Sequence, residues 1–187
     1  MARVSVNRGS LDTLINALDN ADNRAVQSGW FESARYQDDG TPVAAIAAQN
    51  EYGNPKLSIP PRPFIRPTIE GQSANWSTIV EQGIKKAIEN GTGIDRVLNT
   101  LGLKVSADIK NSIVSGDFKA LSPVTIALRK IRNDGQMVIG GKLVGAVAGA
   151  IAQGKTGLGE LGDQSFGNKD PLRETGYLIS TITYEVT

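Results

Sequence analysis

The residue pattern with the most definite chemical meaning lies at the end of an apolar, glycine-containing stretch. Gly149-Ala150-Ile151-Ala152-Gln153-Gly154-Lys155-Thr156 matches the phosphate-loop pattern GxxxxGK[ST] at every fixed position. In a nucleotide site a buried strand precedes this loop and a helix follows it, so that the loop amides surround the phosphates and the threonine hydroxyl meets magnesium. Three glycines within the six residues after Thr156 disfavour that helix. Nucleotide binding through residues 149–156 is therefore the alternative hypothesis.

The residue types that most often carry out catalysis are missing. The chain has no cysteine and no histidine, which excludes disulfides, thiolate metal sites, serine triads, cysteine–histidine dyads and histidine-based zinc sites. Chemistry by carboxylates alone stays open. The sequence suggests no catalytic residue, no cofactor and no metal ligand, and we expect a protein that is not an enzyme.

Length and charge indicate an ordinary globular chain. The 187 residues suit one domain, with 40% hydrophobic and 21% charged residues. No apolar run approaches the roughly 20 residues of a membrane-spanning helix, and the N-terminus lacks a signal-peptide core. The net charge of +1 argues against a protein dominated by phosphate binding. We expect synthesis in a cytoplasm and no membrane partner.

The first half of the chain alternates strand and helix signals. Alternation at Arg3–Asn7 and Arg24–Phe31 predicts two strands, and Ser10 can cap a helix between them. A further helix is predicted to begin with Thr41 as its N-cap and Pro42 at its first position. Gly53 can end that helix in the left-handed conformation.

A proline-rich segment at residues 54–67 follows, and the pattern after it is mainly helical. Five prolines predict stiff, extended backbone from Asn54 to Pro67. Helical spacing of apolar residues then predicts helices at Asn75–Asn90 and Ile94–Ser115. Ser122-Pro123 is expected to start a shorter helix that runs to about Ile131.

The last third of the sequence changes character. We expect a long glycine-rich arm at about residues 133–169, with one marginal helix or hairpin at Val144–Ala152. Alternation from Leu178 to Val186 predicts a final strand. Thr175-Gly176 is expected to form a turn or helix cap before it. The order of elements predicts a single α+β domain over residues 1–187, in which a small, mainly antiparallel sheet is covered on one face by helices.

Several segments carry a family resemblance. They are Gly29-Trp30-Phe31, residues 43–53 ending in Glu51-Tyr52-Gly53, Ile59-Pro60-Pro61-Arg62-Pro63-Phe64-Ile65-Arg66-Pro67-Thr68, residues 121–127, and residues 171–184 with Leu172, Thr175, Gly176 and Leu178. In this order they resemble the neck, tail-completion and virion-morphogenesis proteins of tailed bacteriophages, which share an E-(F/Y)-G helix end, an I-P-(P/A)-R-P-F segment and a late L-x-x-T-G-x-L-x-x-S-I element. The glycine-rich arm matches no part of that pattern.

The resemblance implies a structural virion protein at the head–tail junction, acting as a neck, tail-completion or tail-terminator subunit. Such proteins form homo-oligomeric rings around the DNA channel, usually of six or twelve copies. The implied partners are other copies, the head-completion or connector protein, and the tail-tube or tail-terminator protein. The implied location is the neck or tail of the virion, and a ring lumen permits non-specific contact with packaged DNA.

The candidate interface residues come from the two best-matched motifs. They are Pro60, Pro61, Arg62, Pro63, Phe64, Arg66, Pro67, Thr175, Gly176 and Leu178. An aromatic ring flanked by guanidinium groups on stiff backbone is a composition favoured at protein interfaces. The sequence leaves open whether Phe64 instead fills the core of its own subunit, with the arginines capping helix ends.

Overall fold

The computed structural model describes residues 12, 15, 24–37, 39–57, 59–90, 92–118, 121–133, 141–153, 172 and 176–187. The chain divides into two compact units, one made of Met1–Gly116 with Tyr177–Thr187 and the other of Asp117–Gly176. The predicted arm at residues 133–169 belongs to the second unit, and most of it lies outside the described residues. The predicted strand Arg3–Asn7 also lies outside the described residues. Of the helix expected after Ser10, only Asp12 and Ile15 are described, and both are helical.

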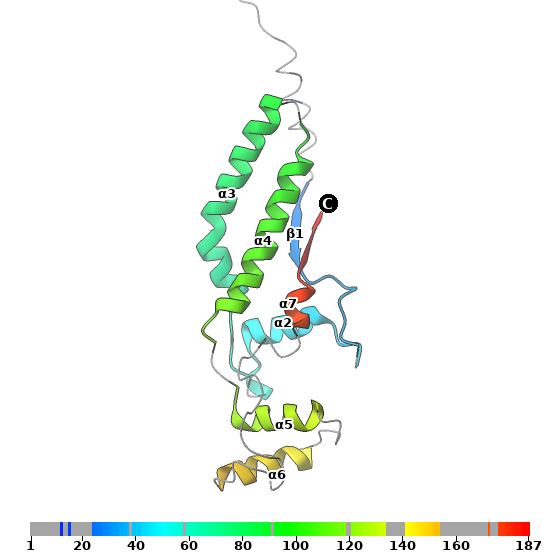
Figure 1. The fold of residues 1–187 in the computed structure, drawn as a ribbon, viewed down its shortest axis with the longest axis vertical. Helices are drawn as coiled ribbons and strands as arrows, with labels where there is room; N and C mark the ends of the chain where they lie inside the picture. The colour runs from blue at the N-terminus through cyan, green and yellow to red at the C-terminus, as the bar shows by residue number, and fades with distance from the viewer. Residues whose placement is uncertain are drawn as a thin grey trace, which may run out of the picture. The chain divides into compact units, whose positions relative to one another are not determined.

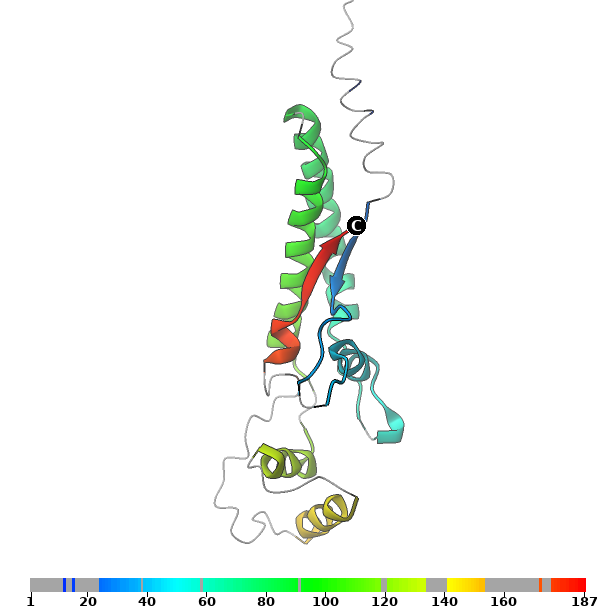
Figure 2. The same ribbon diagram turned by 90° about the vertical axis from the view of Figure 1, so that its right-hand side faces the viewer.

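The first unit is built on a two-stranded antiparallel sheet whose strands lie at opposite ends of the sequence. Strand β1 (Val26–Gly29) pairs with β2 (Thr183–Val186), with Val26 opposite Val186 and Gly29 opposite Thr183. Figure 2 shows the two strands side by side. The predicted α+β class is confirmed, and the two strands that pair lie within the predicted strand regions Arg24–Phe31 and Leu178–Val186.

Helix α4 (Asp95–Ser115) lies against this sheet and separates it from helix α3 (Ile65–Asn90). The Oγ atoms of Ser28 on β1 and Ser106 on α4 are 2.8 Å apart. Gly102 lets the ring of Tyr184 lie directly on the helix, since a Cβ there would be 2.1 Å from the ring. Figure 1 shows α3 and α4 running side by side, with the strands on the other side of α4.

Shorter elements surround one end of this helix pair in both views (Figures 1 and 2). They are α2 (Val43–Tyr52), the 3-10 turn η1 (Pro55–Leu57) and α7 (Tyr177–Ser180). Phe64, just before α3, is fully buried. Trp30, just after β1, meets its ring edge-on at a centroid distance of 5.8 Å and donates its indole N–H to the carbonyl oxygen of Leu178 at 2.8 Å. The end of β1, the start of α3 and α7 therefore share one core.

The second unit contains α5 (Pro123–Asn133) and α6 (Gly141–Ala152). The Oγ atom of Ser122 accepts a hydrogen bond from the backbone N–H of Thr125 at 3.1 Å, which confirms the predicted start of α5. The two helices pack through buried and half-buried apolar side chains: Val124, Ala127, Leu128, Ile131, Leu143, Val147 and Ile151. The segment at Val144–Ala152, for which the sequence allowed a helix or a hairpin, is helical.

Three predicted element boundaries are wrong. Helix α2 begins at Val43 and Thr41 does not cap it, because Pro42 is extended (ψ 130°) and pairs with Arg35 in a β-bridge. Helix α3 begins ten residues before the predicted start, at Ile65. The segment predicted to be extended from Asn54 to Pro67 therefore ends earlier, and η1 interrupts it at Pro55–Leu57.

The last strand is shorter than predicted, because residues 177–180 form the helix α7 and pairing begins only at Thr183. The α4 prediction, Ile94–Ser115, is confirmed to within one residue. Among the residues that the structure describes, no helix is both long and apolar enough to cross a lipid bilayer.

Candidate interaction site

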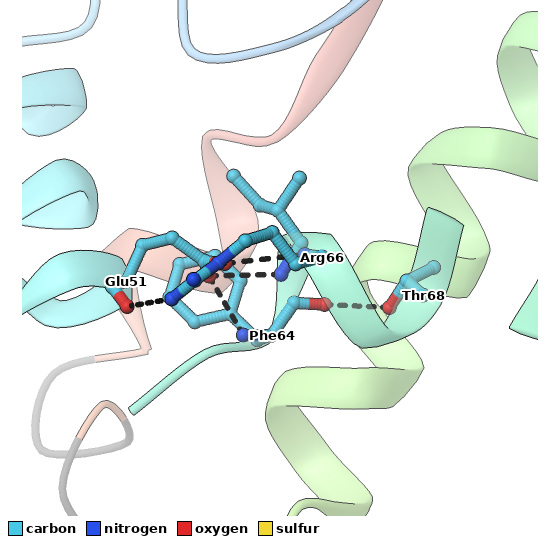
Figure 3. Close-up of polar contacts among 5 residues, drawn as sticks. Glu51, Phe64, Arg66 and Thr68 are labelled. Carbon is cyan, nitrogen blue, oxygen red and sulfur yellow. Dashed lines mark hydrogen bonds and ion pairs between the residues drawn. The ribbon is translucent and has the colours of Figure 1, made fainter. Parts of the chain in front are cut away.

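A buried carboxylate at the end of α2 holds the start of α3. Glu51 is only 2% exposed, and its Oε2 accepts hydrogen bonds from the backbone N–H groups of Phe64 at 2.7 Å and Ile65 at 2.9 Å. Its Oε1 accepts the backbone N–H of Arg66 at 3.1 Å and the Nε–H of the same residue at 3.0 Å (Figure 3). We call this set of contacts the Glu51 clamp.

The clamp satisfies the free donors of the helix. The first four N–H groups of an α-helix have no partner within the helix. In α3 three of them, from Phe64, Ile65 and Arg66, donate to Glu51, and the fourth position is Pro67, which has no N–H. A negative charge at a helix N-terminus is also favoured by the helix dipole. These contacts explain why a proline-rich segment turns into a helix at this point.

The pKa of the Glu51 carboxyl reflects two opposing effects. Burial disfavours the charged form and raises the pKa, while hydrogen bonds from the backbone N–H groups of Ile65 and Phe64, and then from Arg66, lower it. The net pKa lies below the ordinary value of 4.5. Glu51 is therefore ionised at neutral pH, which is the form that accepts all four hydrogen bonds.

Arg66 joins the clamp to the surface. Its Nη2 donates to the backbone oxygen of Glu51 at 3.0 Å, and its Cζ lies 5.1 Å from the centre of the Tyr52 ring. This distance allows a cation–π interaction. The Arg66 side chain is 52% exposed and that of Tyr52 is 68% exposed, so both present surface to solvent.

The turn that connects α2 to the proline segment requires glycine. Gly53 has φ +75°, and a Cβ at this position would lie 2.8 Å from the backbone nitrogen of Pro61 and 2.9 Å from the oxygen of Ile59. Asn54 and Ile59 exchange two backbone hydrogen bonds of 2.8 and 2.9 Å, and the N–H of Arg62 donates to the oxygen of Asn50 at 2.7 Å. The loop is therefore folded back onto the end of α2. Gly53 ends α2 with a positive φ as predicted, but its ψ of 171° places it outside the predicted left-handed helical conformation.

A pocket of about 220 Å³ adjoins the clamp. Residues of α2 and the first turns of α3 line it together with one tryptophan: Trp30, Ala44, Ala47, Ala48, Glu51, Tyr52, Ile65, Arg66 and Ile69. Seven of these nine side chains are aliphatic or aromatic. The pocket is suited to binding an apolar group rather than to carrying out a reaction.

The structure distributes the predicted interface residues differently from the sequence hypothesis. Phe64, Arg62 and Leu178 are buried within this chain, so they are not exposed anchors for a partner. For Phe64, the alternative that it fills its own core is correct.

Exposed and half-exposed positions remain among the predicted interface residues. Arg66, Pro61, Pro63 and Pro67 are exposed, while Pro60 and Gly176 are half-buried. Gly176 has φ +65° immediately before α7, consistent with the predicted turn, and Thr175 lies outside the described residues.

Sequence reasoning gave no role to Glu51, Tyr52 or the alanines of α2. A signal for Glu51 was present, because the helix start at Ile65 to Pro67 needs a capping acceptor and no Ser, Thr, Asp or Asn precedes it at residues 60–64. The pocket carried no such signal, since it depends on how α2 meets α3.

The phosphate-loop pattern starts inside a helix. Residues 141–148, where a nucleotide site would have a strand, belong to helix α6, and so do Gly149–Ala152, which would form the first half of the loop. Lys155 and Thr156 lie outside the described residues. Within the described ranges, no group of three or more acidic side chains is placed to hold a metal ion.

Comparisons with known proteins do not assign this chain to a family. No protein-family model, no curated protein and no solved structure matches it.

Proposed function

We propose that this chain is a structural virion protein of a tailed bacteriophage, a neck, tail-completion or tail-terminator subunit that assembles as a homo-oligomeric ring around the DNA channel at the head–tail junction. Its partners are other copies, the head-completion or connector protein, and the tail-tube or tail-terminator protein. It is made in the bacterial cytoplasm and resides in the virion.

One observation carries this proposal: segments of the motif pattern that are far apart in the sequence meet in one place. Glu51 of the E-Y-G helix end binds the backbone that follows the I-P-P-R-P segment. Phe64 of that segment contacts the ring of Trp30, and the same tryptophan donates to Leu178 of the late element. Residues that recur together in such motifs are expected to serve one structural purpose. Here that purpose is to hold the start of α3 against α2.

The site also favours binding over catalysis. Each Glu51 carboxylate oxygen already accepts two hydrogen bonds, so this group is not available as a general base. Next to it, Tyr52 and Ile69 present apolar surface, with 68% and 48% of the residue exposed. A rigid scaffold that presents an aromatic and an aliphatic side chain beside an arginine is suited to protein–protein contact.

Protein identification and stoichiometry in purified particles test the proposal. We expect purified particles of the phage that encodes this chain to contain it in several copies, at a fixed ratio to the portal protein. The full-length recombinant chain, analysed by native mass spectrometry, is expected to form a closed oligomer alone or with the connector protein. The proposal would be contradicted if the chain were absent from particles and stayed monomeric both alone and with the connector protein.

A further inference from the structure

The exposed face of α2 presents a stripe of small side chains that ends in an aromatic ring. Ala44, Ala48 and Tyr52 are spaced four residues apart, so they lie on one face of the helix, and all three are exposed. Across the pocket stands Ile69 of α3, which is 48% exposed. The small alanine side chains leave the space that the pocket occupies, and Tyr52 and Ile69 form its apolar rim.

The exposed polar group at this rim is a guanidinium. Glu51, which forms an ion pair with Arg66, is buried and already accepts hydrogen bonds from three backbone N–H groups at the start of α3, so the pocket presents the donor side of this pair. Arg66 is 52% exposed and uses Nε and Nη2 for its bonds to Glu51. Among the described residues, Nη1 of Arg66 donates no hydrogen bond. Of the described residues that line the pocket, Arg66 carries the exposed charge, and the geometry of its guanidinium complements a carboxylate.

We propose that this pocket binds an acidic–aliphatic segment of a partner protein: an aliphatic side chain enters between Ala44, Ala48 and Ile69, and the carboxylate of the adjacent residue accepts hydrogen bonds from the Arg66 guanidinium. This inference rests on the proposed role as an assembly subunit and specifies the chemistry of the group that the subunit receives. The stacking of Tyr52 on Arg66 holds the guanidinium in place, which lowers the entropy lost on binding.

The test uses the isolated full-length chain, labelled for NMR, and capped tetrapeptides. The first peptide carries leucine followed by aspartate at its centre, the second has asparagine in place of aspartate, and the third has glycine in place of leucine. We expect the first peptide to shift the resonances of Ala44, Ala48 and the Arg66 side chain, saturating in the millimolar range. The second and third should bind about tenfold more weakly, since each loses one of the two recognition elements.

A pair of matched variants locates the site. Ala48→Glu fills the pocket and places a carboxylate near Arg66, so we expect it to abolish the peptide-induced shifts. Ala74→Glu makes the same exchange at an exposed position of α3 outside the pocket and should leave them unchanged. Both alanines are exposed, so both variants should fold, which the unliganded spectra verify.

Three results would overturn the proposal: no saturable shift with the first peptide, equal binding of the aspartate and asparagine peptides, or loss of binding in both variants. Pocket resonances that move with protein concentration alone would also overturn it, in favour of a second copy as the occupant. Because the assay uses the isolated chain, it can fail while the chain is found in particles, and it can succeed while the chain is absent from them.

Discussion

Replacement of Glu51 by glutamine removes the charge of the clamp while keeping the shape of the side chain. Each carboxylate oxygen of Glu51 accepts two N–H groups. In Glu51→Gln one of these oxygens becomes an NH₂ group, which donates and cannot accept. Two of the four hydrogen bonds are therefore lost.

The magnitude follows from the burial of the donors that lose their acceptor. A buried N–H without a partner costs about 1–3 kcal/mol, and a hydrogen bond to a charged group contributes about 1.5–3 kcal/mol. The N–H of Phe64 is buried, while those of Ile65 and Arg66 are part-buried and water can partly replace the acceptor. The Arg66 side chain is half exposed, so its ion pair contributes little. We expect Glu51→Gln to lower the free energy of unfolding by about 3 kcal/mol.

Urea denaturation followed by circular dichroism measures this loss. Glu70→Gln is the matched control, because Glu70 is exposed on the same helix and the change should stay within about 0.5 kcal/mol of the wild type. If the free energies of unfolding of Glu51→Gln and Glu70→Gln differ by less than about 1 kcal/mol, the Glu51 clamp does not stabilise the fold.

The same variant has a pH signature. The pKa of Glu51 in the folded chain is lower than its ordinary value of 4.5, so its contribution to stability is fully present above pH 4.5 and is lost as the pH falls through the folded pKa. Between these two values the unfolded chain binds more protons than the folded chain, and stability rises with pH. We therefore expect the wild type to lose stability more steeply than Glu51→Gln on acidification, and parallel acid limbs would contradict the assignment.

Three further variants, two of them with a matched control, test the Gly53 turn, the packing of β2 on α4 and the phosphate-loop alternative. Gly53→Ala should lower the free energy of unfolding by about 2–3 kcal/mol, because it combines a positive φ with a steric clash against Pro61. Gly40→Ala, which has a similar φ but open space around it, should lower it by about 1 kcal/mol. Equal losses would contradict the close approach of Gly53 to Pro61. Gly102→Ala places a methyl group against the ring of Tyr184, which packs β2 on α4, so the melting temperature of this variant should be lower than that of the wild type. Gly71→Ala, in open space on α3, should raise the melting temperature slightly. Lys155→Ala should leave nucleotide binding unchanged in equilibrium dialysis, and a specific loss would favour the phosphate-loop alternative.

Helix α4, the start of α5 and the presence of a C-terminal strand could be predicted from the sequence because their signals are local. Helix α4 shows its apolar residues at helical spacing over 21 residues, and Ser122-Pro123 marks the start of α5. The start of α3 could not be predicted in this way. Pro63 and Pro67 disfavour a helix when local rules alone are applied, and the carboxylate that caps this helix comes from Glu51, 14 residues before Ile65.

The sequence pattern did not determine which of the candidate interface residues are exposed. The motif residues do form one structural unit, yet Phe64 and Leu178 serve the core and not the surface. A sequence does not distinguish a buried aromatic ring from an interface anchor, because both need an apolar side chain on ordered backbone. The exposed group that the pocket presents is Arg66 with Tyr52, and their proximity depends on the tertiary contact between α2 and α3.

If a tailed phage encodes this chain, as proposed, a cryo-EM reconstruction of the head–tail junction of its particles tests the proposed function most directly. We expect a closed ring of copies around the DNA channel, with α3 and α4 packed as in Figure 1 and the pocket beside Arg66 occupied by an acidic–aliphatic segment of a neighbouring protein. A junction fully accounted for by other proteins, with no density for this chain, would contradict it.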